Sequence, residues 1–299
     1  MSVSINEHPD YPFIWAGNRD EYFERVATPL EIGKDGLLCC RDSEAGGSWM
    51  GLNVKTGEFA ALTNVRAPPS KPVRSRGELI LRSLSGDAEA AILSGQYENY
   101  NLLFGRLSAD GPPQLQFSVS APPDPTPKTR AMAESSFAGV KSNDHGGEWT
   151  TAGRCDLSDE CTWAKAVWLQ RAVSDALATE SVQAARGEAG ARDVLLGALI
   201  AQLSASTIGE DGLVAAAAAA KPSAYSPCTA AAETRMHAAP FVMPFTGAGP
   251  NGAADGHYGT VSQSVVIQCR SERCVFYAYR TVSAETQFSE WASRRVDLT

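Results

Sequence analysis

The sequence has no excess of basic residues and no long apolar run. Its 26 Lys and Arg stand against 34 Asp and Glu, which leaves a formal net charge of −8. Proteins that bind nucleic acid gather cationic side chains to contact phosphates, so we do not expect nucleic acid as a partner. No uninterrupted apolar run approaches the ~20 residues that cross a bilayer. We therefore predict no membrane span.

The common signatures of catalytic and metal sites are also missing. The H-E-x-x-H, G-x-S-x-G and Walker motifs do not occur. The seven cysteines lack the C-x2-C spacing of a structural zinc site, so we expect no metal. The segment Gly247 to Gly252 spells G-x-G-x-x-G, but it contains Pro250 and no helical pattern follows it. This context disfavours a dinucleotide site.

The beginning of the chain and the cysteine count bear on location. The first residues lack the basic and apolar regions of a signal peptide, and Glu7 and Asp10 are acidic where a transit peptide avoids acids. An odd number of scattered cysteines is more typical of buried free thiols in a reducing compartment than of a disulfide framework. We therefore expect a cytoplasmic protein.

Strand patterns occupy both ends of the chain, and helical patterns lie between them. Short apolar or alternating segments predict strands near residues 3–5, 13–16, 48–52, 59–62, 100–104, 115–119, 264–267 and 274–279. Helices are predicted from Ser75, which forms a capping box with Glu78, then over 87–93, and around 163–173 and 194–203. The four prolines of Ala121 to Pro127 predict a loop. Because strands at both ends would share one sheet, we predict a single α+β domain.

Polar side chains follow the apolar strand Phe13 to Ala16. Asn18, Arg19, Asp20 and Glu21 place an amide, a guanidinium and two carboxylates where the chain leaves the core. Arg19 and a neighbouring carboxylate could clamp a polar group of a ligand, or they could pair with each other on a solvated turn.

Two asparagines also end apolar segments. Asn64 and Asn143 could donate hydrogen bonds to a ligand or an oxyanion, or each could simply form a turn. The residues alone leave these alternatives open.

Eight short sequence motifs, taken in their order along the chain, favour a functional role for these residues. They are AGNRDEYFER from Ala16, GGSWMGLN from Gly46, AALTN from Ala60, SRGELI from Ser75, YENYNLLFG from Tyr97, SN at Ser142, TWAKAV from Thr162 and YGT from Tyr258. In this order they resemble the NRDE family, also called the transport and Golgi organisation 2 family. Eight motifs over ~240 residues make a chance match implausible.

The resemblance implies a fold and a domain organisation. The family is similar to N-terminal-nucleophile hydrolases, whose fold is a four-layer αββα sandwich of two antiparallel sheets. It implies one domain over residues 1–299, with insertions at 144–160 and 207–256.

The resemblance also implies roles for particular residues. Arg19 and Asp20 would orient a nucleophile, and Asn64 and Asn143 would be oxyanion or ligand donors. The motifs further imply ligand-binding or site-orienting roles for a set of residues that includes Asn18, Glu21, Thr63, Asn101, Ser142, Tyr258 and Thr260. We expect Val261, where the family usually has Arg, to remove one cation from the pocket.

The nucleophile departs from the family pattern. The family begins Met-Cys, whereas this chain begins Met1-Ser2, and the spacing from Ser2 to His8 is about three residues shorter. A shortfall of this size displaces Ser2 by ~10 Å along a strand and turns its side chain to the other face. We therefore expect either no hydrolysis or a sequence that starts late.

The sequence leaves three functions open. The resemblance favours a carrier or regulator implicated in Golgi organisation, protein secretion and lipid or haem handling, with acyl-CoA or haem as its ligand and with Golgi or mitochondrial association left open. The alternatives are an N-terminal-nucleophile amidohydrolase acting on a small linear amide and a non-catalytic structural or interaction protein. The C-x-x-C-H haem attachment pattern is missing, so no haem ligand is named.

Overall fold

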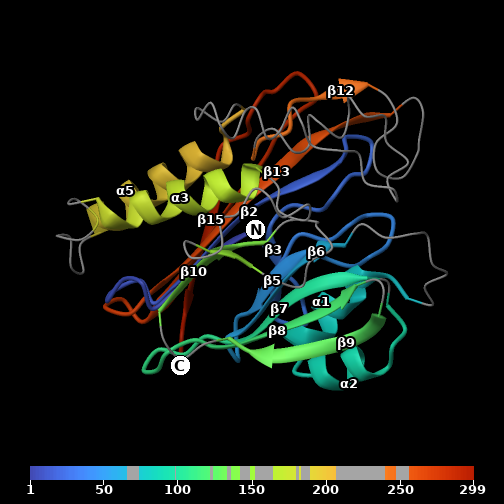
Figure 1. Ribbon diagram of the computed structural model, residues 1–299, viewed down its shortest axis with the longest axis horizontal. Helices are drawn as coiled ribbons and strands as arrows, with labels where there is room; N and C mark the ends of the chain where they lie inside the picture. Colours follow the sequence, from blue (N-terminus) through green and yellow to red (C-terminus); the bar gives the residue numbers. More distant parts are fainter. Residues whose placement is uncertain are drawn as a thin grey trace.

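The computed structural model describes residues 1–65, 74–97, 99–121, 124–132, 136–141, 149–151, 164–179, 182, 189–206, 240–246 and 256–299. These residues form two antiparallel sheets and four helices (Figure 1). The mixed α+β class predicted from the sequence is therefore confirmed.

The first sheet contains strands from both ends of the chain. Its order is β11 (Thr150–Thr151), β10 (Phe137–Val140), β1 (Ser2–Ile5), β2 (Phe13–Tyr22), β13 (His257–Cys269), β14 (Cys274–Thr281) and β15 (Ala292–Asp297), with β12 (Phe245–Thr246) paired to β13. The prediction that terminal strands share one sheet is confirmed, because β2 pairs with both β1 and β13.

The second sheet is built from consecutive hairpins. Its order follows the sequence: β3 (Glu31–Ile32), β4 (Leu37–Cys39), β5 (Met50–Asn53), β6 (Glu58–Asn64), β7 (Tyr100–Arg106), β8 (Gln114–Ala121) and β9 (Asp124–Ala131). Both predicted hairpins are present, as β5 with β6 and β7 with β8.

Strand β9 corrects one prediction. The segment Ala121 to Pro127 was expected to be a loop, but residues 124–127 begin β9, which pairs with β8 at the edge of the sheet. An edge strand needs ladder hydrogen bonds on one side only, so Pro125 and Pro127 are tolerated there.

The helices lie where the periodicity predicts them, as α1 (Arg76–Leu84), α2 (Ala88–Leu93), α3 (Ala164–Ala178) and α5 (Ala189–Leu203). Ser75 caps α1, since its side chain accepts a hydrogen bond from Gly77 N at 3.3 Å. The second half of the expected capping box differs, because the Glu78 carboxylate pairs with Arg74. Figure 1 shows α3 and α5 side by side, with α1 and α2 at the opposite end of the molecule.

The side chains of β2 alternate between two apolar clusters, one on each face of the first sheet. Phe13 and Trp15 belong to a cluster that also contains residues of the second sheet, such as Leu52 and Phe59. Residues on the other face of β2, beginning with Ile14, pack in a cluster with α3 and α5. A third cluster joins α1 and α2 to the second sheet. Because successive side chains of a strand point to opposite faces, one strand serves two clusters.

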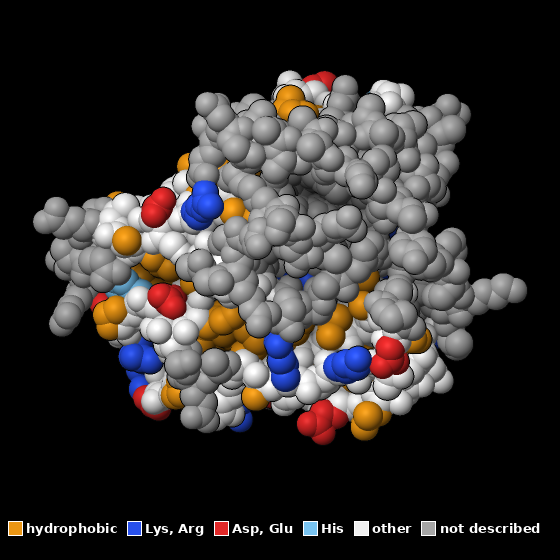
Figure 2. All heavy atoms as spheres, in the orientation of Figure 1, with side chains coloured by type: hydrophobic (Ala, Val, Ile, Leu, Met, Phe, Trp, Pro, Cys, Tyr) orange, Lys and Arg blue, Asp and Glu red, His pale blue; other side chains and the backbone are white. Residues whose placement is uncertain are grey.

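The single domain over residues 1–299 stays a prediction, as do its insertions. Within 144–160 only residues 149–151 are described, and within 207–256 only residues 240–246 and 256. In the part of the chain that the structure describes, no helix is both long and apolar enough to span a membrane. On the face shown in Figure 2, described side chains of both charges are interspersed.

Candidate functional site

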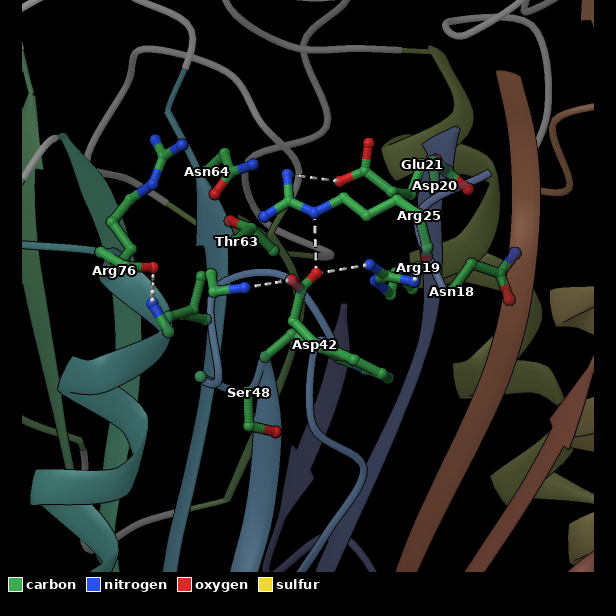
Figure 3. Close-up of a pocket in the computed structure, with 16 residues that line it drawn as sticks. Asn18, Arg19, Asp20, Glu21, Arg25, Asp42, Ser48, Thr63, Asn64 and Arg76 are labelled. Atoms are coloured by element: carbon green, nitrogen blue, oxygen red, sulfur yellow. Dashed lines mark hydrogen bonds and ion pairs between the residues drawn. The ribbon is translucent and has the colours of Figure 1, made fainter. Parts of the chain in front are cut away.

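A cavity of about 190 Å³ opens between the second half of β2, the connection from β4 to β5, the end of β6 and the start of α1. Figure 3 shows its lining side chains converging from these segments. The lining residues are Asn18, Arg19, Asp20, Glu21, Arg25, Asp42, Ala45, Gly47, Ser48, Trp49, Leu62, Thr63, Asn64, Ser75, Arg76 and Gly77. Segments that are distant in sequence therefore build a mainly polar site.

Asp42 is the centre of the polar cluster (Figure 3). Its Oδ2 lies 3.0 Å from Arg19 Nη2 and 2.8 Å from Arg25 Nε. Its Oδ1 accepts a hydrogen bond from Ala45 N at 2.9 Å. The Arg19 and Asp42 side chains are only 10% and 11% exposed, so they form a shielded ion pair. One carboxylate thus fixes two guanidinium groups.

The charge state of this cluster follows from its contacts. Burial opposes ionisation of Asp42, but the hydrogen bond from Ala45 N and the two arginines hold the pKa of this carboxyl below its usual value. Burial likewise opposes the charge on Arg25, but its bond to Asp42 raises the pKa of Arg25 above its usual value. Arg19 also lies over the Trp49 ring, 4.6 Å from the centroid. Asp42 and Arg25 are therefore both charged at neutral pH.

The start of α1 forms the opposite wall. Ser48 N donates to Gly77 O at 3.1 Å, and a Cβ added to Gly47 would lie 2.5 Å from the Gly77 carbonyl carbon. Only glycine permits such a close approach of two backbones. Arg76 Nη1 donates to Asn99 O at 3.1 Å. In Figure 3, Arg76 lies across the cavity from Arg19, on the side of Asn64.

The four predicted residues of β2 divide between two roles. Arg19 and Glu21 take part in the cluster, since Glu21 Oε2 lies 3.6 Å from Arg25 Nη1. Asn18 also lines the cavity, but its side chain points away from Asp42 (Figure 3). Its Nδ2 donates to Leu203 O at 2.9 Å and to Pro240 O at 2.8 Å. Asn18 thereby fastens the end of α5 to the sheet.

Asp20 is held from β13. Thr260 Oγ1 donates to Asp20 Oδ1 at 2.8 Å, and Tyr258 OH donates to Asp20 O at 3.2 Å. Tyr258 and Thr260 are not among the lining residues, and they contact the cavity wall where they bond to Asp20.

Thr63 and Asn64 line the cavity at the end of β6. Asn101 lies behind them on β7, fully buried, and its Nδ2 donates to Thr63 Oγ1 at 3.2 Å. The predicted residues Ser142 and Asn143 lie outside the described residues. The remaining candidates are thus brought to the cavity or directly behind it.

Ser2 is placed elsewhere. It pairs with Ala16 and Val140, and both of these belong to the cluster that contains α3 and α5. Arg19 lies four residues after Trp15 on β2 and shares its face, which is the face toward the second sheet. Ser2 is not among the lining residues, and its side chain is on the opposite face from Arg19.

Sequence reasoning missed several residues of the site. Arg25, Asp42, Ser48, Trp49 and Arg76 line the cavity but were not singled out. All of them except Asp42 lie within the family motifs named above, and these motifs could have identified them. Asp42 had no signal of its own, because only the packing of the two sheets brings it against Arg19.

The described residues offer few ligands for a metal or a haem. They contain no group of three His, Cys, Asp or Glu side chains placed to hold a metal ion. The lining residues include no His, Cys, Met or Tyr, the side chains that ligate haem iron. The described wall of the cavity therefore does not fit axial ligation of a haem.

Comparisons with known proteins agree with the motifs. A family model described as "Transport and Golgi organisation 2" matches residues 1–283. The chain is 33% identical over 113 residues to a transport and Golgi organization protein 2 homolog from Bos taurus, covering 33% of this chain and 41% of the relative. A homolog from Homo sapiens is 31% identical over 140 residues, covering 41% of this chain and 50% of the relative. The matches thus span half of these curated relatives or less.

Proposed function

The chain belongs to the transport and Golgi organisation 2 family, and from this premise we propose that it is a ligand-binding carrier or regulator whose cavity holds the polar part of its ligand. The observation that carries the proposal is an open polar cavity with Arg76 on one wall and, on the other, Arg19 and Arg25 fixed by Asp42. Guanidinium groups held in place before binding lose little freedom when a ligand arrives.

The size and lining of the cavity favour one ligand class. Its volume of about 190 Å³ is below the roughly 300–1,000 Å³ of sites that enclose a drug-sized ligand. It therefore suits a small polar group, or one end of a longer ligand that continues outside. Arginine forks pair with phosphate and carboxylate oxygens, and hydroxyl and amide side chains such as those of Thr63 and Asn64 can hydrogen-bond to an amide. An acyl-CoA presents phosphates and amides, so we favour it over haem.

We also propose the four-layer αββα arrangement for the fold. The three apolar clusters support it, since one joins the two sheets and each of the others joins one sheet to its own helix pair. In this arrangement the cavity lies where the two sheets separate at the polar end of β2. Roles in Golgi organisation, secretion and lipid handling, and a cytoplasmic location, belong to the same proposal.

Calorimetric titration of palmitoyl-CoA, CoA and palmitate into the protein tests the proposal. We expect palmitoyl-CoA to bind, with CoA weaker and palmitate weakest, because the anionic and amide groups are those the cavity recognises. Arg76→Met keeps the aliphatic stem and removes the charge, and should weaken binding about tenfold, a loss of ~1.4 kcal/mol. Arg76→Lys should be intermediate.

The matched control is Arg294→Met, which removes an exposed arginine of β15 outside the cavity. Its affinity should equal that of the unaltered protein. No binding of any of the three compounds, or equal loss in both variants, would refute the proposal. A haemin titration followed by absorbance should give no signal that depends on Arg76.

A further inference from the structure

Two cysteines face each other at the closed end of the β13–β14 hairpin. Cys269 ends β13 and Cys274 begins β14, and the two are direct partners in the antiparallel register. Their side chains are 2% and 0% exposed, and both belong to the cluster of the first sheet with α3 and α5. Directly opposed residues have their Cα atoms ~4.5–5.5 Å apart, within the ~4.4–6.8 Å range that a disulfide spans.

A second cysteine pair in the same chain provides the contrast. Cys39 and Cys40 are adjacent in sequence, but Cys39 packs in the cluster with α1 and α2 while Cys40 packs between the two sheets. Neighbours on an extended chain point to opposite faces, so their sulfur atoms cannot meet without a change of backbone. Cys39 and Cys40 are thus close in sequence but point apart, whereas Cys269 and Cys274 are further apart in sequence but lie opposite each other.

Two polar side chains contact the sulfur of Cys269. Its Sγ donates to Glu272 Oε1 at 3.8 Å, and Ser271 Oγ lies 3.3 Å from the same sulfur. Glu272 is in turn held by Arg192, at 3.0 Å, and by Arg295, at 2.6 Å. Polar side chains therefore lie at the sulfur of Cys269, and Glu272 links this end of the hairpin to α5 and β15.

Cys274 differs from its partner. Burial raises the pKa of the Cys274 thiol to about 12, so this thiol is a poor first nucleophile. It is better suited to the second step, in which its position opposite Cys269 gives it a high effective concentration.

We propose that Cys269 and Cys274 form an oxidative modification site, a dithiol that a low-molecular-weight disulfide such as oxidised glutathione converts to one cross-strand disulfide. Cys269 loses its proton and attacks one sulfur of the oxidant, which releases one glutathione thiolate and leaves a mixed disulfide. Cys274, deprotonated, attacks Cys269 Sγ and releases the second glutathione thiolate. The protein dithiol loses two electrons and two protons, and one oxidised glutathione becomes two reduced glutathiones.

The site is separate from the cavity. Arg19 pairs with Ser262 on β13, and Cys269 lies seven residues further along that strand, which is about 23 Å at ~3.3 Å per residue. The hairpin turn instead contacts the loop after β1, since Arg270 N donates to Asp10 O at 2.8 Å. Through Glu272 and Arg192 it also contacts α5. Oxidation should therefore stabilise this end of the first sheet and leave ligand affinity unchanged.

The experiment treats the whole protein with oxidised glutathione, followed by intact mass and peptide mapping. We expect the loss of two hydrogen atoms and, after trypsin, a disulfide that joins the peptide ending at Arg270 to the peptide from Cys274 to Arg280. The reaction should be slow, since the buried thiols react only when the hairpin opens locally. Dithiothreitol should restore the mass.

Variants decide which thiols react. Cys269→Ser and Cys274→Ser should each abolish the linked peptides, whereas Cys39→Ser with Cys40→Ser should retain them. The oxidised protein should unfold at a higher temperature than the reduced protein. A lasting glutathione adduct, an unchanged mass, linked peptides that persist in Cys269→Ser, or a lower unfolding temperature would each overturn the proposal. The mapping uses the unaltered protein, so the test stands even where a variant fails to fold.

Discussion

The two halves of β2 share one backbone and one alternation but differ in what they contact. In the first half, Phe13 and Trp15 project between the sheets and Ile14 projects toward the helices, and all three are buried among apolar side chains. In the second half the same alternation places Arg19 between the sheets, against Asp42, and Asn18 toward the end of α5. One half is core and the other half is wall of a cavity.

This difference shows how a strand supplies both stability and a site. Burial of apolar side chains between the sheets stabilises the fold in any register that keeps these side chains away from water. A partly buried arginine is tolerated only with a partner, and Asp42 provides it. In the polar half, removal of one charged partner should therefore destabilise the protein more than a small change of side-chain shape. In the apolar half, a change of side-chain shape or volume should have the larger effect. The following changes test this contrast.

Phe13→Ala should have the largest effect. Phe13 is 0% exposed, and its ring centroid lies 4.9 Å from that of Phe59. Its removal leaves a cavity between the sheets, and the free energy of unfolding should fall by about 3–5 kcal/mol. Urea denaturation measures this loss. Ligand affinity of the folded fraction should be unchanged, and a large loss of affinity would contradict the separation of the two halves.

Asp42→Asn should have the next largest effect. It removes the carboxylate that lies between Arg19 and Arg25 and leaves Arg25 only its longer contacts with Glu21 and Glu44. The free energy of unfolding should fall by about 2–3 kcal/mol, because the shielded Arg19 loses its partner. The matched control is Asp110→Asn, which breaks an exposed ion pair with Arg273 and should cost less than ~1 kcal/mol. Equal effects in the two variants, measured by urea denaturation, would show that the cluster is not shielded.

The same carboxylate predicts a pH dependence. Burial opposes the shift, but hydrogen bonding by Ala45 N and the arginines lowers the pKa of Asp42 in the folded state. The stability that the Asp42 carboxylate contributes to the folded state is therefore complete above the ordinary aspartate pKa of ~3.9. It is lost as the pH falls through the lowered pKa of Asp42. The stability difference between the unaltered protein and Asp42→Asn should narrow as the pH falls below ~4. A difference that widens toward acid would contradict this sign.

Gly47→Ala should disturb the wall opposite β2. Its Cβ would lie 2.5 Å from the Gly77 carbonyl carbon, so α1 must shift, and stability should fall by about 1–3 kcal/mol. Affinity for palmitoyl-CoA should also fall, because Arg76 moves with α1. Gly197→Ala in α5, where nothing lies within 4 Å of the added Cβ, is the control and should be neutral or slightly stabilising.

Thr260→Val should have the smallest effect. It removes the hydroxyl that donates to Asp20 Oδ1 at 2.8 Å and accepts from Val242 N at 2.8 Å, while it keeps the shape of the side chain. Stability should fall by about 1–2 kcal/mol, as thermal unfolding would show. Ligand affinity should fall more than in Phe13→Ala if Asp20 positions the cavity wall. An affinity equal to that of the unaltered protein would restrict Thr260 to a structural role.

Much of the fold was predictable because its signals are local. The alternation of Phe13 to Ala16, the cap at Ser75 and the turn between β13 and β14 are each encoded within a few residues. Strand β9 was missed because Pro125 and Pro127 suggest a loop unless the strand is known to lie at an edge. No pattern in the sequence states which strand is outermost.

The candidate site divides in the same way. Arg19, Glu21, Thr63 and Asn64 were found from motifs in single segments, and they line the cavity. Asp42 and Arg76 were not, since their roles depend on segments that meet only after folding. Asn18 was found, but its bonds to Leu203 O and Pro240 O could not have been foreseen.

The sequence by itself determined the strand and helix pattern, the family and most of the polar residues near the cavity. The tertiary structure decided which of them meet: Arg19 with Asp42, Gly47 with Gly77, and Cys269 with Cys274 rather than Cys39 with Cys40. The reason is physical. Periodicity fixes which face of an element a side chain occupies, whereas contact between two faces depends on how whole sheets and helices pack, and this is a property of the complete chain.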